Sequence, residues 1–308
     1  MSRTPASGGS PLAFVTLLTV LSVPFWLLGA VFDRTGSLPM GMPVSAFQFV
    51  LPVTVAAVLV FREEGGGGVR RLMKRTVSGG GTTRRIRWAV AVLLVPALML
   101  VTYGLTALAG EPPRGSHSPL ASVPLLLALY LLAALAEEAG WTGYLLRPVS
   151  ERYGALGAGL VIGLVWGAWH LVAYVQAGRS VPWIVGQVLG SVAVRVLMVR
   201  LVASAGGTVL VAVVVHTTIN LAQSLFPGYP DQAGPALLYG LLAALTAMGV
   251  VWARGAGPRP ARPGHEPAGR PRRRSGGPAR SPGLPSPPTA APPATPPPAG
   301  RTWRPGGR

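Results

Sequence analysis

The sequence predicts an all-α fold, a polytopic transmembrane helix bundle of about eight spans that is followed by a disordered basic tail. Half of the 308 residues are hydrophobic, and only 12% are charged. Long apolar stretches recur near the length of about 20 residues that crosses a bilayer as a helix. Basic residues gather in alternate connecting segments, as they do in multi-pass proteins. We therefore assign residues 1–253 to an integral membrane domain and residues 254–308 to the tail.

Each predicted span is an apolar stretch of roughly bilayer length. The first span follows a single basic residue, Arg3, and is too long for the apolar region of a cleaved signal peptide, so we expect it in the mature protein. In chain order, the predicted spans cover residues 11–32, 42–61, 88–109, 120–146, 155–175, 182–200, 208–226 and 235–252.

The charge pattern predicts the orientation of the spans. Segment 62–87, which we expect to be a loop, holds eight basic residues against Glu63 and Glu64. Positively charged segments stay in the cytoplasm, so eight spans place the N- and C-termini on the cytoplasmic side of the plasma membrane. The basic residues of this segment are Arg62, Arg70, Arg71, Lys74, Arg75, Arg84, Arg85 and Arg87.

The tail is rich in proline, glycine and arginine and has too little apolar content to form a core, so we predict that it is disordered. Its eleven arginines face a single acidic residue, Glu266. A basic tail beside a membrane is attracted to anionic lipid headgroups, and the same holds for segment 62–87. Beside eight spans we favour this reading over nucleic-acid binding.

Few ionisable residues fall within the predicted spans. Of nine acidic residues, only Glu137 and Glu138 do so. An ionisable group in the hydrocarbon costs a few kcal/mol and usually marks a functional cavity. Two histidines, His170 and His216, and the amide of Asn220 complete the set. His216 and Asn220 are four residues apart and share one helix face, so we expect these groups to look into one cavity.

This set of residues predicts a hydrolase. The chain has no cysteine, which excludes a thiolate nucleophile. Two adjacent carboxylates in a medium of low dielectric constant resist ionising together, and one of them can serve as a general base. A histidine could hold the attacking water, while a second histidine and an asparagine amide could donate to the oxyanion.

A metal mechanism is the open alternative, because two histidines and a glutamate form a usual catalytic zinc set. The ligands would be Glu137, His170 and His216. The chain has no His-Glu-x-x-His helix, and we favour catalysis without a cofactor over a divalent metal such as zinc.

Three motifs in order, within residues of about 120–226, resemble those of the CPBP intramembrane proteases. This family includes the type II CAAX prenyl endopeptidases and bacterial relatives linked to bacteriocin self-immunity. The matched positions are Glu137 and Glu138 of Glu-Glu-x-x-x-Arg, Trp166 and His170 of Phe-x-x-x-His, and His216 and Asn220 of His-x-x-x-Asn.

The resemblance implies a function and a role for each residue. Glu137 would activate the water with help from His170, and Glu138 would support it. His216 and Asn220 would stabilise the oxyanion. The substrate would be a membrane-associated peptide or protein, prenylated in the CAAX branch of the family, and the family's metal dependence has been argued both ways.

The first motif departs from the family pattern, because Thr142 stands where the family has arginine. A hydroxyl cannot neutralise the glutamates, so another cation is expected in that role. Arg195 in the sixth predicted span is one candidate, since an intramembrane arginine usually pairs with an acidic group. The alternative is that Arg195 snorkels to the cytoplasmic edge. Arg147 could also reach back from the end of the fourth span.

Two other functions stay open at this point. The Thr142 departure is compatible with a catalytically silent membrane protein that binds a partner or confers immunity. Glu137, Glu138 and His170 could instead relay protons or a cation in a transporter, although we find no internal repeat of the kind many transporters show. Gly159, Gly163 and Gly167 recur every four residues and predict close approach of a neighbouring helix.

Overall fold

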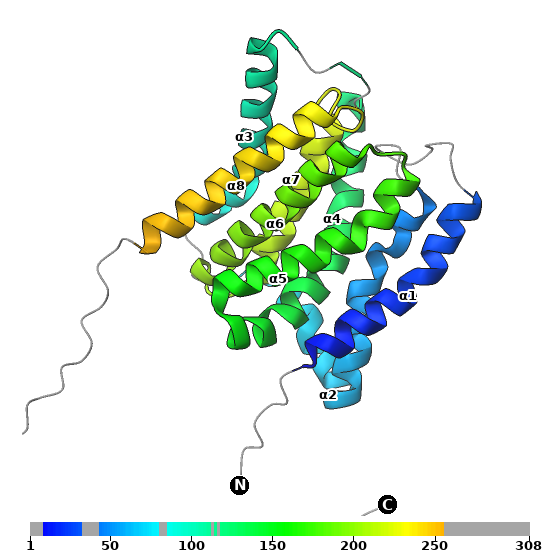
Figure 1. The fold of residues 1–308 in the computed structure, drawn as a ribbon. Coiled ribbons are helices and arrows are strands. Elements are labelled where there is room, and N and C mark those ends of the chain that lie inside the picture. Colours follow the sequence, from blue (N-terminus) through cyan, green and yellow to red (C-terminus); the bar gives the residue numbers. More distant parts are fainter. Residues whose placement is uncertain (1–8, 33–42, 80–84, 112–113, 116–117, 256–308) are drawn as a thin grey trace, which may run out of the picture. The chain divides into compact units, whose positions relative to one another are not determined.

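The computed structural model describes residues 9–32, 43–79, 85–111, 114–115 and 118–255, and these form helices joined by short connections (Figure 1). The predicted all-α fold is confirmed. The expected tail lies outside the described residues, apart from Arg254 and Gly255, which end the last helix. The helices are α1 (Pro11–Phe32), η2 (Val44–Val50), α2 (Leu51–Val77), α3 (Arg85–Leu108), η3 (Leu120–Ser122), α4 (Val123–Gly140), η4 (Trp141–Leu145), α5 (Leu146–Gln176), α6 (Val181–Ser204), α7 (Val209–Leu225) and α8 (Ala233–Gly255).

The predicted count of eight spans agrees only approximately with the lengths of the helices. Six helical stretches of the described residues are long and apolar enough to cross a membrane. One of them, residues 120–176, holds two predicted spans in 57 residues, and Gly154 interrupts it with a φ of 68°. Glycine tolerates this left-handed backbone, so the helix can break there. The seventh helix, α7, has only 17 residues.

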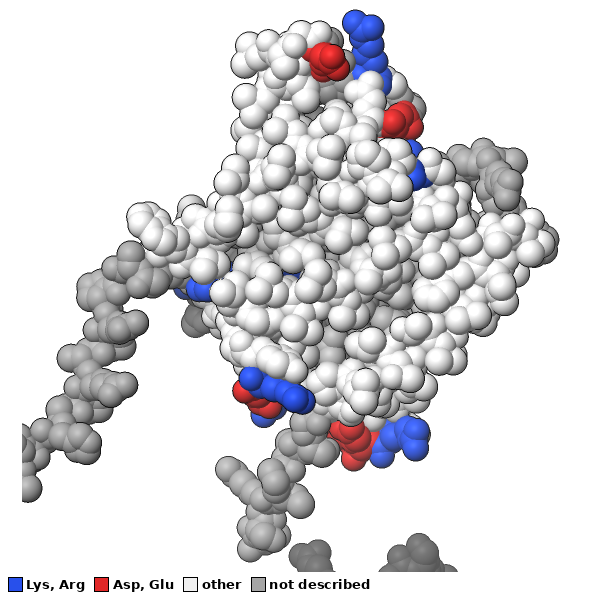
Figure 2. Space-filling view, viewed as in Figure 1, with Lys and Arg blue, Asp and Glu red and all other residues white. Residues whose placement is uncertain are grey.

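The charged surface fits a multi-pass membrane protein. Figure 2 shows a broad face that is nearly free of charged side chains, with most of the visible Lys, Arg, Asp and Glu at its margins. Large apolar side chains such as Leu93, Leu132 and Leu164 are exposed on the helices. Exposed apolar surface of this extent is favourable against lipid tails rather than water.

The structure corrects the expectation of a loop over residues 62–87. Helix α2 continues to Val77 past a break at Gly65, where φ is 66°, and α3 already begins at Arg85. The four consecutive glycines suggested a loop. Downstream of them, however, good helix formers place Leu72 and Thr76 on a buried face, and packing of this face favours the helix.

Close packing between α5 and α6 fixes the centre of the bundle. A Cβ at Gly159 would lie 2.8 Å from the Val196 Cα, and a Cβ at Gly163 would lie 2.9 Å from the Val192 Cα. Only glycine allows the two backbones to come this close, which confirms the predicted glycine strip. Helices α5 and α6 run side by side (Figure 1), and the Arg195 Cβ of α6 would lie 3.2 Å from the same Cβ position at Gly163.

The short helix η2 is tied to the same centre. The side chain of Gln48 accepts a hydrogen bond from the Trp26 indole at 2.7 Å and donates one to the Trp169 carbonyl at 3.4 Å. Gln48 thereby links α1 and α5 through a buried amide. This contact holds η2 beside the residues described next.

Candidate functional site

The two adjacent glutamates of α4 have different surroundings. Successive side chains on a helix project about 100° apart, so neighbours cannot face the same space. Glu137 lines a cavity of about 260 Å³, whereas Glu138 does not. A π-helical turn, η4, follows directly and carries Thr142. Such turns often occur at functional sites.

Glu138 is fully buried and is held by three side chains. Arg195 donates to its Oε2 at 2.8 Å and to its Oε1 at 3.0 Å, in a bidentate pair. The Thr142 hydroxyl donates to Oε2 at 2.5 Å, and His216 Nδ1 donates to Oε1 at 2.9 Å. A carboxylate bound in this way is a structural anion that orients its neighbours.

Arg195 therefore supplies, from a different helix, a cation that the first motif lacks. Its side chain is only 1% exposed, so the snorkelling interpretation is wrong. Arg147, the other cation considered from the sequence, pairs instead with Glu151 on the surface at 2.9 Å. The guanidinium also stacks over the Trp166 ring, 4.6 Å from its centroid, so it contacts both sides of the site.

Glu137 is 5% exposed and keeps one oxygen directed at a histidine. The Trp166 indole N–H donates to Oε2 at 2.9 Å. The other oxygen, Oε1, lies 4.0 Å from His216 Nε2. The aromatic motif position thus contributes a hydrogen bond here that a phenylalanine would lack.

The hydrogen bonds of the two histidines define which ring nitrogen carries the proton. His216 Nδ1 faces the Glu138 carboxylate, and His170 Nδ1 faces the Trp166 carbonyl at 2.8 Å. Carboxylate and carbonyl oxygens only accept, so both Nδ1 atoms donate. Each neutral imidazole is then left with Nε2 as a proton acceptor.

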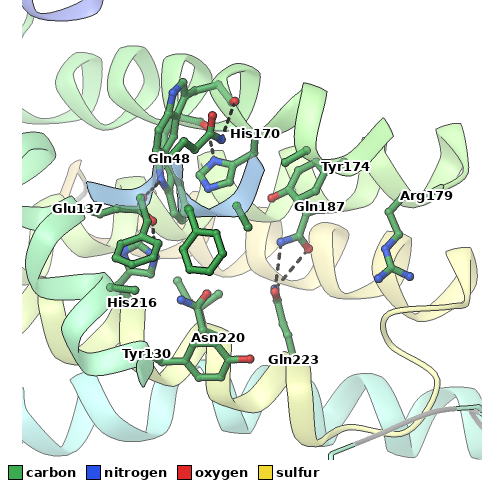
Figure 3. Close-up of a pocket in the computed structure, with 18 of the residues that line it drawn as sticks. Gln48, Tyr130, Glu137, His170, Tyr174, Arg179, Gln187, His216, Asn220 and Gln223 are labelled. Atoms are coloured by element: carbon green, nitrogen blue, oxygen red, sulfur yellow. Dashed lines mark hydrogen bonds and ion pairs between the residues drawn. The ribbon is translucent and has the colours of Figure 1, made fainter. Parts of the chain in front are cut away.

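The cavity brings together five of the sequence-predicted residues. Glu137, His170, His216 and Asn220 line it, from α4, α5 and α7 (Figure 3). Trp166 lines it as well. Glu138, Thr142 and Arg195 stand behind the wall and do not line it.

Sequence reasoning missed the rest of the polar lining. Gln187 and Gln223 lie toward one end of the cavity, near Arg179 (Figure 3). Gln223 follows His216 by seven residues and Asn220 by three, so helical spacing alone places it on the same face. Gln187 offers a weaker signal, because a neutral amide in an apolar helix is less conspicuous than a charge.

The geometry does not assemble the alternative metal site. Within residues 9–32, 43–79, 85–111, 114–115 and 118–255, no three His, Cys, Asp or Glu side chains are grouped so that they could hold a metal ion. Glu137, His170 and His216 line the same cavity, and the Nδ1 hydrogen bond of each histidine leaves its Nε2 as the nitrogen that could bind a metal. Because these side chains are not grouped so that they could hold one ion, no metal is assigned to the site.

Comparison with known proteins supports the resemblance seen in the motifs. Residues 119–222 match the family described as type II CAAX prenyl endopeptidase Rce1-like, and this segment contains all three motifs. The chain is 26% identical over 143 residues to CAAX prenyl protease 2 of Methanococcus maripaludis. That match covers 44% of this chain and 52% of the relative, so the chain spans about half the length of the curated relative it matches. The predicted family resemblance is confirmed.

Proposed function

We propose that this chain, whose residues 119–222 match the Rce1-like family, is an intramembrane endopeptidase that hydrolyses a peptide bond at the membrane. The observation that carries the proposal is the pair Glu137 Oε1 and His216 Nε2, 4.0 Å apart at the cavity wall. A water oxygen about 2.8 Å from each atom fits between them. The carboxylate and the imidazole then hold the nucleophile together.

The chemistry follows from the hydrogen bonds of these groups. Glu137 takes a proton from the water as its oxygen attacks the peptide carbonyl carbon, and the Trp166 N–H keeps the carboxylate oriented. Asn220, one turn beyond His216 on α7, donates its amide N–H to the developing oxyanion. The proton that Glu137 took from the water then passes to the departing amine as the C–N bond breaks.

The histidines take different roles from those implied by the resemblance. His216 accepts no proton on Nδ1, because Glu138 holds that N–H, and its Nε2 faces Glu137. It therefore positions the water in place of donating to the oxyanion. His170 contributes its Nε2 from α5, across the same cavity, and assists the proton transfer to the leaving group.

The proposal includes a location and a substrate class. The chain would lie in the plasma membrane with both termini in the cytoplasm, where segment 62–87 and the basic tail contact anionic headgroups. The substrate would be a membrane-associated peptide or protein. No cofactor is required, and nucleic acid is not a partner.

The test is cleavage of membrane-anchored reporter peptides by purified protein in lipid vesicles. Prenylated and unprenylated peptides form separate arms, and each runs with wild type, Glu137→Gln and Glu64→Gln. The last variant is a matched control, because Glu64 is an exposed glutamate paired with Arg71 on the surface. Cleavage by wild type and Glu64→Gln, lost in Glu137→Gln, supports the protease.

Two results would contradict it. If wild type cleaves none of the peptides faster than Glu137→Gln does, the result would favour a catalytically silent binding or immunity protein. Ion flux across the vesicle that depends on Glu137, without cleavage, would favour a transporter.

A further inference from the structure

A second polar cluster lines the cavity beyond the proposed catalytic groups. Figure 3 shows Glu137 and His216 toward one end, Asn220 beyond them, and Gln187 and Gln223 further along. The proposed hydrolysis does not use the two glutamines. Both are buried, at 6% and 3% exposure, although each lines the cavity.

The glutamines form a reciprocal amide pair between α6 and α7. Gln187 Nε2 donates to Gln223 Oε1 at 3.2 Å, and Gln223 Nε2 donates back to Gln187 Oε1 at 3.3 Å. The Tyr229 hydroxyl donates to Gln187 Oε1 at 2.5 Å and accepts from Gln223 Nε2 at 3.2 Å. The amide planes are thereby fixed relative to the cavity.

These bonds leave one acceptor and one donor for a ligand. Gln223 Oε1 has two lone pairs and accepts one of these hydrogen bonds. Gln187 Nε2 has two N–H groups and gives one to Gln223. The Tyr174 hydroxyl also lines the cavity beside Gln187, so it can take the second N–H and offer its own O–H instead (Figure 3). In either case, a donor stands beside an acceptor.

A donor beside an acceptor complements a peptide group, which carries one C=O and one N–H. The surrounding wall is mostly apolar and aromatic, with Phe47, Trp183 and Ile219 among its residues. A peptide that enters such a cavity gives up its water, and each unpaired main-chain group then carries a penalty. Fixed amides along the path remove that penalty.

The spacing along α7 fits an extended peptide. Gln223 follows His216 by seven residues, which is about 10 Å at roughly 1.5 Å per residue of helix. An extended chain rises about 3.3 Å per residue, so this distance corresponds to about three residues. We infer that the Gln187–Gln223 pair binds the main chain of an extended peptide substrate, two or three residues from the bond that is cleaved beside Glu137. This inference rests on the proposed function.

The experiment replaces single amides of a cleaved reporter peptide by esters, which removes one main-chain N–H at a time. In wild type, the ester that faces Gln223 should lower kcat/KM about tenfold, the typical effect of one hydrogen bond. The isosteric variant Gln223→Met should lose a similar factor on the all-amide peptide. It should show no further loss with that ester, while esters elsewhere affect both enzymes equally.

A purely structural role gives a different pattern, because the losses from Gln223→Met and from each ester would then multiply at every position. That outcome overturns the inference. The same ester series, measured by binding to the inactive Glu137→Gln protein, must show the same coupling in the Gln223→Met background. Gln187→Met provides a second variant if Gln223→Met does not fold. Absence of any cleavage by wild type would instead defeat the proposed function.

Discussion

Arg195 and Glu138 form a bidentate pair across 57 residues of sequence, with N–O distances of 2.8 and 3.0 Å. Both side chains are buried, at 1% and 0% exposure. The first motif has Thr142 where the family has arginine, and Arg195 of α6 supplies the positive charge from a different helix. A cation therefore pairs with Glu138, although position 142 of the motif is not basic.

Loss of the Arg195 charge should destabilise the fold. In Arg195→Met, the buried Glu138 carboxylate keeps only the Thr142 and His216 hydrogen bonds, and breaking one partner of a buried pair costs about 3–5 kcal/mol. Adding Glu138→Gln removes the unpaired charge, so the double variant should be more stable than Arg195→Met. Unfolding followed in detergent measures both. A double variant no more stable than the single one would refute the role of the pair.

Moving the charge back into the motif should restore function. An arginine at position 142 lies four residues after Glu138, on the same face of the chain. We expect Thr142→Arg to recover cleavage in the Arg195→Met background and to be neutral or harmful in wild type, where the two cations repel each other. The readout is kcat/KM for all four combinations. Equal effects of Thr142→Arg in both backgrounds would mean that Arg195 serves another purpose.

The indole N–H of Trp166 should matter for rate more than for stability. Trp166→Phe keeps an aromatic ring beside Arg195 but removes the 2.9 Å hydrogen bond to Glu137, so kcat should fall about tenfold. Trp169→Phe is the matched control, because it removes a 2.8 Å bond to Ser22 and leaves Glu137 untouched. Equal losses of kcat in the two variants would argue against orientation of Glu137 by Trp166.

A methyl group at the α5–α6 contact should separate the helices. In Gly163→Ala, the new Cβ would meet the Val192 Cα at 2.9 Å and the Arg195 Cβ at 3.2 Å, and such overpacking typically costs about 1–3 kcal/mol. Gly249→Ala has no atom within 4 Å and should be neutral or stabilising. Thermal unfolding of the two variants gives the comparison. Similar midpoints would show that the contact has room to relax.

Removal of divalent metal should leave cleavage unchanged. Among the described residues, no three His, Cys, Asp or Glu side chains are grouped so that they could hold a metal ion, and the proposed water is held by Glu137 and His216. Rates measured after dialysis against a chelator, and again after zinc is added back, provide the test. A chelator-sensitive rate that zinc restores would replace the metal-free mechanism.

Membrane chemistry made much of this protein predictable from sequence. A span needs about 20 apolar residues, so the helices can be recognised in the sequence as long apolar stretches. The few polar residues inside these stretches can be recognised in turn, because they are rare there. The Glu137, His170 and His216 positions were therefore identifiable without coordinates. The helix over residues 66–77 was not, because the glycine run is locally a loop signal and only packing of Leu72 and Thr76 favours the helix.

The sequence by itself determined the all-α class, the motif residues and their order on three helices, because these depend on local composition and on helical spacing. Only the tertiary structure decided which glutamate faces the cavity, which cation binds the other one, and that Gln187 of α6 pairs with Gln223 to extend the site. The contacts of Glu138 with Arg195 and His216 join residues 57 and 78 positions apart, and the rotation and packing of whole helices set them. The sequence does not specify how one helix is rotated against another, so it does not show which distant side chains an arginine or a glutamate in a span will contact.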